Sequence, residues 1–216
     1  MEIWLAFSGF EEMEKAHAYP IKGVLTNPTI VSRAGMGWRE AISRMNEIGD
    51  LPLGLQVVST EMDRMLEEVE TYRGLVNRKP LIIKLPFCRD ALRVVGFIKK
   101  RGLGVNVAAV CTFSQAVIAL ETDPDYISIY VGRVSDGGGN GAELVRKIKT
   151  YAVESNKRTL VLAASLRDAC GFEEAALAGA DAAVVTLPVL EDAVKSGLTD
   201  ESIATFKEEW KKAEGA

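Results

Sequence analysis

Short, continuously apolar runs alternate with longer amphipathic segments along the whole chain, and no other feature of the sequence restricts the fold as much. In the longer segments, hydrophobic residues recur three or four positions apart with charges on the other face, which predicts helices at 61–72, 90–101 and 142–155. Runs that are apolar on both faces are typical of parallel strands covered by helices. Eight runs fit this description: 3–7, 23–26, 53–58, 81–86, 105–109, 126–131, 159–163 and 182–185.

This alternation predicts a closed parallel barrel. Each strand and the helix after it occupy about 25–35 residues, close to the minimum for a β-α-β unit. Eight such units in 216 residues predict a single α/β domain over residues 1–216, a (β/α)8 TIM barrel. An open doubly wound sheet is the alternative. However, no Gly-x-Gly-x-x-Gly motif follows the first apolar run, where a dinucleotide-binding sheet would carry it.

Helical patterns continue beyond the eighth run, at 191–196 and again at 200–213. In the second of these, Ile203, Phe206 and Trp210 form one apolar stripe. A stripe beyond a closed barrel must be covered, either by its own barrel or by a neighbouring subunit. The sequence leaves both arrangements open.

The composition argues against several classes of protein. A formal net charge of −4 and a pI near 5.3 are unfavourable for a surface that binds nucleic acid. Three cysteines and one histidine, His17, show no metal-ligand spacing, so we expect neither a metal site nor a cofactor. The first residues do not resemble a signal peptide, and no stretch approaches the roughly 20 apolar residues of a membrane span. We therefore expect a cytoplasmic protein without membrane contacts.

Lys84 is the only charged residue in the apolar run 81–86. Such a lysine could extend to the surface or pair with a buried carboxylate. If it points into the barrel instead, desolvation lowers its pKa and supplies the neutral amine that attacks a carbonyl. A barrel enzyme carries its site at the C-terminal ends of its strands. Lys84 is therefore a candidate nucleophile, and the chain a candidate class I aldolase.

Other polar residues occur at comparable depth in their strands. Each alone could be a satisfied core residue or a loop cap, but their shared location at one rim favours a substrate-binding site. These residues are Thr26 and Asn27 after the second run, Gln56, Asn106, Tyr130, Arg133 and Ser165.

Arg133 and Ser165 suggest an anion site. Arg133 precedes a glycine-rich segment, 137–141, that leads into a predicted helix. Glycine-rich backbone and a helix N-terminus can bind phosphate through free N–H groups. A loop that ends in an Asn140 N-cap is equally compatible with these residues.

Several of these segments resemble the small transaldolases and fructose-6-phosphate aldolases. The resemblance follows the whole chain in order, and Thr-Asn-Pro-Thr together with Lys-Leu-Pro is its most specific part. It implies that Lys84 forms a Schiff base, that Arg133 and Ser165 contact phosphate, and that Asn27 holds substrate hydroxyls. The segments are Gly-Val-Leu-Thr-Asn-Pro-Thr-Ile at 23–30, Ile-Lys-Leu-Pro at 83–86, Tyr-Val-Gly-Arg at 130–133, Ala-Ala-Ser at 163–165 and Thr-Leu-Pro at 186–188.

Two positions in this resemblance indicate the aldolase branch. Transaldolases of the family tend to carry Glu on the third strand and Phe at the end of the sixth, whereas the aldolases carry Gln and Tyr. This chain has Gln56 and Tyr130. The resemblance then implies that Tyr130, with a water held by Gln56, transfers protons.

Two other positions depart from the family. Ala6 stands where the first strand normally carries Asp, and Ala108 where the fifth normally carries Thr. Loss of one positioned acid/base group costs about 10²–10⁴-fold in rate. Phe7 would add bulk to the pocket if it pointed inward.

The function predicted from these residues is a class I aldolase that cleaves or forms a C–C bond in a ketose or ketose phosphate such as fructose 6-phosphate. Its donor would resemble dihydroxyacetone and its acceptor would be an aldehyde. A transaldolase, which passes the same unit between sugar phosphates, is the first alternative. A weakly active or non-catalytic sugar-phosphate-binding protein is the second, because of Ala6 and Ala108. The resemblance also implies a homo-oligomer, a pentamer or decamer, in which the C-terminal helix reaches a neighbour.

Overall fold

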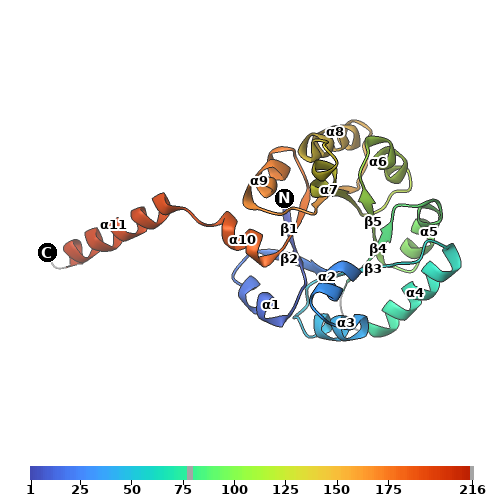
Figure 1. The fold of residues 1–216 in the computed structure, drawn as a ribbon, viewed down its shortest axis with the longest axis horizontal. Coiled ribbons are helices and arrows are strands. Elements are labelled where there is room, and N and C mark those ends of the chain that lie inside the picture. The colour runs from blue at the N-terminus through green and yellow to red at the C-terminus, as the bar shows by residue number, and fades with distance from the viewer. Residues whose placement is uncertain (77–79, 215–216) are drawn as a thin grey trace.

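A computed structural model describes residues 1–76 and 80–214. Its centre is a closed barrel in which eight parallel strands pair in sequence order and the last pairs with the first (Figure 1). This confirms the predicted (β/α)8 TIM barrel. The strands are β1 Glu2–Ala6, β2 Ile21–Leu25, β3 Leu53–Gln56, β4 Leu81–Pro86, β5 Gly104–Val110, β6 Tyr126–Tyr130, β7 Leu160–Ala164 and β8 Ala182–Val185.

Helices surround the barrel on the outside, and one further helix extends away from it (Figure 1). The helices are α1 Phe10–Ala16, α2 Pro28–Arg33, α3 Trp38–Asn46, α4 Met62–Leu75, α5 Arg89–Lys99, α6 Phe113–Leu120, α7 Val131–Asp136, α8 Gly141–Glu154, α9 Ala169–Leu177, α10 Leu187–Ala193 and α11 Gly197–Glu214. Within the described ranges, no helix is both long and apolar enough to cross a membrane.

Element boundaries differ from the predicted ones by small amounts. The third strand ends at Gln56 instead of residue 58, and the sixth ends at Tyr130 because α7 begins at the next residue. The short helices α2 and α7 were not predicted, since six residues are too few to show a helical repeat. The final helices begin earlier than predicted, at Leu187 and Gly197.

Large side chains fill the barrel interior at its N-terminal end. Trp4 packs edge-on against Tyr126, with ring centroids 5.7 Å apart, and both rings donate hydrogen bonds to the Glu2 carboxylate. The indole fits because the neighbouring strand carries Gly23, where an added Cβ would lie 2.3 Å from the Trp4 ring. This packed floor leaves the polar residues at the opposite, C-terminal end of the strands to line the pocket described below.

Phe7 lies in the other hydrophobic layer, between the strands and the surrounding helices. It is fully buried in the larger core cluster and makes an edge contact with Phe10 of α1. The side chain therefore does not narrow the barrel interior.

Helix α11 projects from the barrel with no buried residue (Figure 1). Phe206 and Trp210 are each 65% exposed. The described part of the chain therefore leaves the predicted apolar stripe uncovered.

We expect the substitution Gly23→Ala to lower the free energy of unfolding by about 1–3 kcal/mol, because the new methyl group must displace the Trp4 ring. Urea unfolding followed by circular dichroism measures this change. Gly96→Ala is the matched control. No atom lies within 4 Å of its added Cβ, so helix propensity should leave α5 as stable or more stable by about 0.5–1 kcal/mol. Equal effects of the two substitutions would contradict this account of the barrel floor.

Candidate active site

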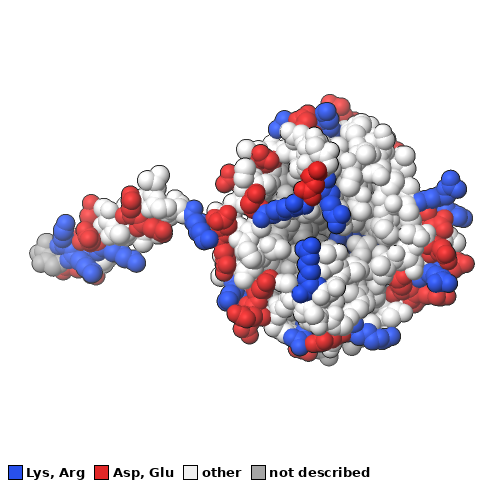
Figure 2. Space-filling model, in the orientation of Figure 1, with Lys and Arg blue, Asp and Glu red and all other residues white. Residues whose placement is uncertain are grey.

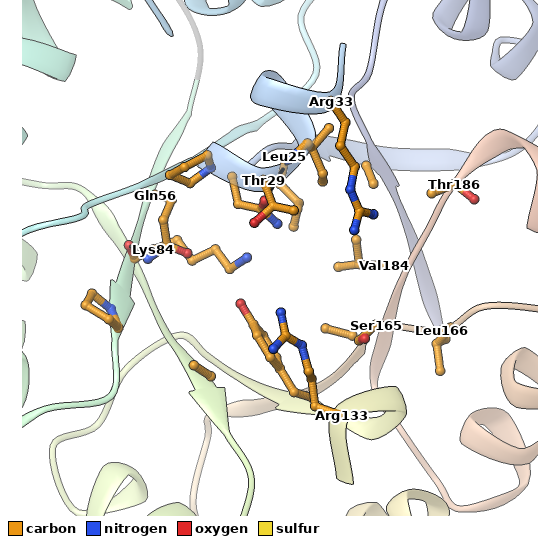
Figure 3. A pocket seen from close by; sticks show the side chains of 18 of the residues that line it. Leu25, Thr29, Arg33, Gln56, Lys84, Arg133, Ser165, Leu166, Val184 and Thr186 are labelled. Carbon is orange, nitrogen blue, oxygen red and sulfur yellow. Dashed lines mark hydrogen bonds between the residues drawn. The ribbon is translucent and has the colours of Figure 1, made fainter. Parts of the chain in front are cut away.

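A pocket with a volume of about 910 Å³ opens at the C-terminal ends of the strands (Figure 3). Each of the eight strands, or the segment directly after it, contributes to its wall. Basic side chains gather around this hollow on the face shown in Figure 2. The pocket brings together six residues predicted from the sequence: Asn27, Gln56, Lys84, Tyr130, Arg133 and Ser165.

Lys84 lies at the centre of this group. Its neighbours in register are Gln56 on β3 and Asn106 on β5, and its side chain points into the pocket (Figure 3). The residue is 3% exposed, and Nζ lies 5.7 Å from the centroid of the Tyr130 ring, within the range of a cation–π contact. Among the described residues, no carboxylate forms an ion pair with Lys84.

Burial lowers the pKa of Lys84 to about 8. The physical cause is desolvation, which disfavours the ammonium form in the barrel interior. A pKa in this range leaves roughly a tenth of the amine uncharged at pH 7, far more than an ordinary lysine with a pKa of about 10.4. The environment thus supplies the chemical form that attacks carbonyl groups.

Gln56 and Tyr130 present different chemistry to the lysine. Both N–H groups of the Gln56 amide are used on the backbone, since Nε2 donates to the carbonyls of Val57 (2.9 Å) and Lys84 (3.0 Å). The carbonyl oxygen Oε1 is therefore left to accept a hydrogen bond from the pocket. Burial raises the pKa of Tyr130, which keeps its phenol protonated near neutral pH and able to donate a proton.

Asn27 is held by the helix that follows it. It is the N-cap of α2, and its Oδ1 accepts a hydrogen bond from the Ile30 N–H at 3.0 Å. The side-chain NH₂ is consequently the part of Asn27 available to a ligand.

Thr26 and Asn106 lie elsewhere. Thr26 is fully buried and donates to the carbonyl of Phe7, whereas Asn106 lies below Lys84 in a small cavity and accepts a hydrogen bond from Ser128 at 2.9 Å. The structure does not bring these two side chains into the pocket wall, and their predicted contacts with substrate stay predictions.

The residues of the predicted anion site lie at the ends of β6 and β7. Ser165 and Arg133 line the pocket together with Arg167, which forms an ion pair with Asp136. The backbone of Ser165 has a φ of 64°, in the left-handed region that a serine seldom adopts. Gly132 permits the close packing here, because an added Cβ would lie 2.2 Å from the carbonyl oxygen of Ser165.

The glycine-rich segment 137–141 does not line the pocket. Asn140 instead caps α8, with its Oδ1 accepting from the Glu143 N–H at 2.8 Å. Of the two arrangements left open by the sequence, the structure has the capped loop.

Sequence reasoning missed Arg33, Arg167 and Asp136, which also line the pocket. Arg167 follows Ser165 by two residues at a strand end, so the same positional rule could have found it. Arg33 has no such signal, because it reaches the pocket only through the unpredicted helix α2. The described residues contain no group of three or more His, Cys, Asp or Glu placed to hold a metal ion.

These features define a β/α-barrel protein with a buried lysine at the centre of a pocket rimmed by arginines. Comparison with known protein families is consistent with this description. Residues 3–216 match the family model described as Transaldolase/Fructose-6-phosphate aldolase. The chain belongs to this family, and it is therefore a carbohydrate enzyme of the class I aldolase and transaldolase group.

Relatives in this family cover essentially the whole chain. A protein named "Probable transaldolase" from Caldicellulosiruptor saccharolyticus is 32% identical over 214 residues, covering 98% of each chain. Proteins with the same name from Clostridium botulinum and Aquifex aeolicus are also 32% identical, over 216 and 213 residues, and cover 100% and 98% of this chain and 99% and 97% of their own. These relatives are named for the transaldolase and not for the aldolase branch.

A solved structure supports the fold alone. A flavocytochrome b2 variant with sulfite bound superposes with a TM-score of 0.60 at 12% sequence identity. The alignment covers 87% of this chain and 57% of that one, so the chain spans little more than half the length of that protein.

We expect imine formation at Lys84 to rise about tenfold per pH unit below pH 8 and to level off above it, because the neutral amine attacks and its pKa is about 8. The measurement is the borohydride-trapped dihydroxyacetone adduct on Lys84, quantified by peptide mass spectrometry after short incubations between pH 6 and 10. Lys84→Met should give no adduct at this position. A profile that still rises at pH 10, as for an exposed lysine, would show that burial does not set this pKa.

Proposed function

We propose that the protein is a transaldolase that works through a Schiff base on Lys84. The observation that carries the proposal is the burial of Lys84, 3% exposed, in the centre of a pocket with a cationic rim. A buried amine of this kind supports attack on a ketose carbonyl, and the rim supports binding of a sugar phosphate. The names of the relatives support transfer as the reaction.

In the proposed reaction, Nζ of Lys84 attacks the ketose carbonyl carbon and the carbinolamine loses water to give an iminium ion. The iminium accepts the electron pair of the C3–C4 bond as that bond breaks, which releases an aldehyde and leaves an enamine of the dihydroxyacetone unit. The proton lost from the C4 hydroxyl passes to a base. The enamine then adds to the carbonyl of an acceptor aldehyde, whose oxygen takes up a proton, and hydrolysis frees Lys84.

Tyr130 is the proposed proton-transfer group. Its ring is next to Lys84, and its raised pKa favours the protonated phenol. The phenol donates its proton to the departing hydroxyl of the carbinolamine, and the phenolate left behind takes up the C4 hydroxyl proton as the C3–C4 bond breaks. The free Oε1 of Gln56 is placed to accept a hydrogen bond from a water that relays the proton. Asp136 is the one acidic side chain in the described pocket wall, and it already forms an ion pair with Arg167. It is therefore not assigned the proton transfer.

The substrate phosphate is proposed to bind at Arg133 and Ser165, with Arg167 as a further contact. The three side chains come from the adjacent ends of β6 and β7. Guanidinium groups and a hydroxyl suit the oxygens of a phosphate through charge-assisted hydrogen bonds.

An aldolase that releases dihydroxyacetone without an acceptor is the second candidate, favoured by Gln56 and Tyr130.

Ala6 bears on how active the protein is. It lines the pocket with a methyl group at the position where family members carry Asp, and Ala108 is fully buried outside the pocket wall. The proposed chemistry therefore depends on Tyr130 for proton transfer, and a weakly active protein is the third candidate.

We expect release of glyceraldehyde 3-phosphate from fructose 6-phosphate to depend on added erythrose 4-phosphate, because the enamine on Lys84 needs an acceptor. A coupled dehydrogenase assay measures the release, and mass spectrometry identifies the seven-carbon ketose formed. Release at the same rate without acceptor would establish the aldolase instead. No turnover, and no borohydride-trapped Lys84 adduct with any ketose, would exclude both enzymes. Lys84→Met provides the inactive control.

We further propose that α11 packs on a neighbouring subunit in a pentamer or decamer. Its apolar residues Leu198, Phe206 and Trp210 are exposed in the single chain, and a partner subunit would bury them.

Multi-angle light scattering of the full chain should give the mass of a pentamer or a decamer, and a chain ending at residue 196 should give a smaller assembly, because removing α11 removes this contact. Circular dichroism of the shortened chain checks that the barrel stays folded. A full-length monomer at micromolar concentration would contradict the proposal.

A further inference from the structure

Arg33 enters the pocket from a different side than Arg133. It is the last residue of α2, and its side chain extends inward toward the centre of the pocket, whereas Arg133 approaches from the α7 side (Figure 3). Among the described residues, no acidic side chain forms an ion pair with either of these two arginines. Arg167, in contrast, is already paired with Asp136.

The wall around Arg33 offers more hydrogen-bond donors than acceptors: the hydroxyls of Thr29 and Thr186 can do either, and the other polar side chains donate (Figure 3). Oδ1 of Asn27 is occupied by the N-cap bond, which leaves its NH₂ group, and the guanidinium of Arg33 has only N–H groups. The nearby strand ends contribute Ala6, Leu25 and Val184, which carry no polar side-chain atoms. A ligand group that satisfies this wall must accept hydrogen bonds, and a negative charge on it would strengthen them.

The pocket as a whole is also strongly basic. Its described lining contains Arg33, Lys84, Arg133 and Arg167 against the single acid Asp136. One substrate phosphate at Arg133 and Ser165 leaves the guanidinium of Arg33 uncompensated. A pocket lined by one sign of charge attracts ligands of the opposite sign.

We propose that Arg33 and Asn27 form a second anion subsite, so that the preferred substrate is a ketose with an anionic group on each side of its carbonyl. The carbonyl lies at Lys84, one anion binds at Arg133 and Ser165, and a second phosphate or a carboxylate binds at Arg33. This inference rests on the proposed Schiff-base function and specifies its substrate class as a dianionic keto sugar.

Isothermal titration calorimetry tests the subsite with two probes that differ by one phosphate, fructose 6-phosphate and fructose 1,6-bisphosphate. The full-length protein carries Lys84→Met, so that covalent chemistry does not contribute to the heat. We expect the bisphosphate to bind more tightly. Adding Arg33→Gln should raise its Kd about 10- to 100-fold, the effect of losing a charge-assisted contact, while changing the Kd of the monophosphate much less.

Two further variants serve as comparisons. Arg39→Gln removes the same charge from α3, outside the pocket wall, and should leave both dissociation constants unchanged. Arg133→Gln should weaken both sugars.

Three results would overturn the proposal: no preference for the bisphosphate, no effect of Arg33→Gln, or equal weakening of both sugars by Arg33→Gln. The last would show that Arg33 shares the phosphate of Arg133. Failure of the Schiff-base function appears separately, as the absence of a trapped adduct on Lys84 in the unsubstituted protein.

Discussion

Closure of the parallel barrel is the constraint on which the rest of this structure depends. Because the eight strands run in one direction and pair in order, their C-terminal ends form a single ring. A side chain that points inward from the fourth strand is then surrounded by the other seven. The amine of Lys84 is shielded from solvent in this position, and this desolvation lowers its pKa. The same closure places Tyr130 beside the amine and the arginines around the opening.

The site lowers the stability of the folded state, and packing elsewhere in the barrel must offset this loss. The lowered pKa means that keeping Lys84 protonated in the folded state is less favourable by about 3 kcal/mol. Ser165 and Ala109 line the pocket with positive φ angles, which cost non-glycine residues about 1–2 kcal/mol each. The dense packing of Trp4 against Gly23 and of the helices against the outer face of the strands supplies the opposing stability. Two of the four positive-φ non-glycine residues in the described part of the chain, together with the desolvated lysine, thus lie at the end of the barrel where a ligand is expected to bind.

The fold could be predicted because each strand is short, apolar and followed by a clear helical repeat. Six site residues could also be predicted, because the rule that barrel sites lie at strand ends applies directly to positions such as Lys84 and Ser165. The same rule included Thr26 and Asn106, which the structure places outside the pocket wall. Successive side chains of a strand point to opposite faces of the sheet, so a shift of one position moves a side chain from the barrel interior to the helix layer. Thr26 points toward the surrounding helices for this reason. Arg33 was missed, since a six-residue helix turns it back over the opening.

The sequence by itself determined the eightfold strand–helix repeat, the isolated lysine within a buried strand and the family resemblance, because these are properties of residue type and order. Only the tertiary structure decided that Asn140 caps a helix instead of lining a phosphate site and that Phe7 packs outside the barrel. It also decided that Arg33 and Arg133 approach the pocket from different sides. Each of these depends on the direction of a side chain after the barrel has closed, and that direction is fixed by contacts between segments far apart in the chain.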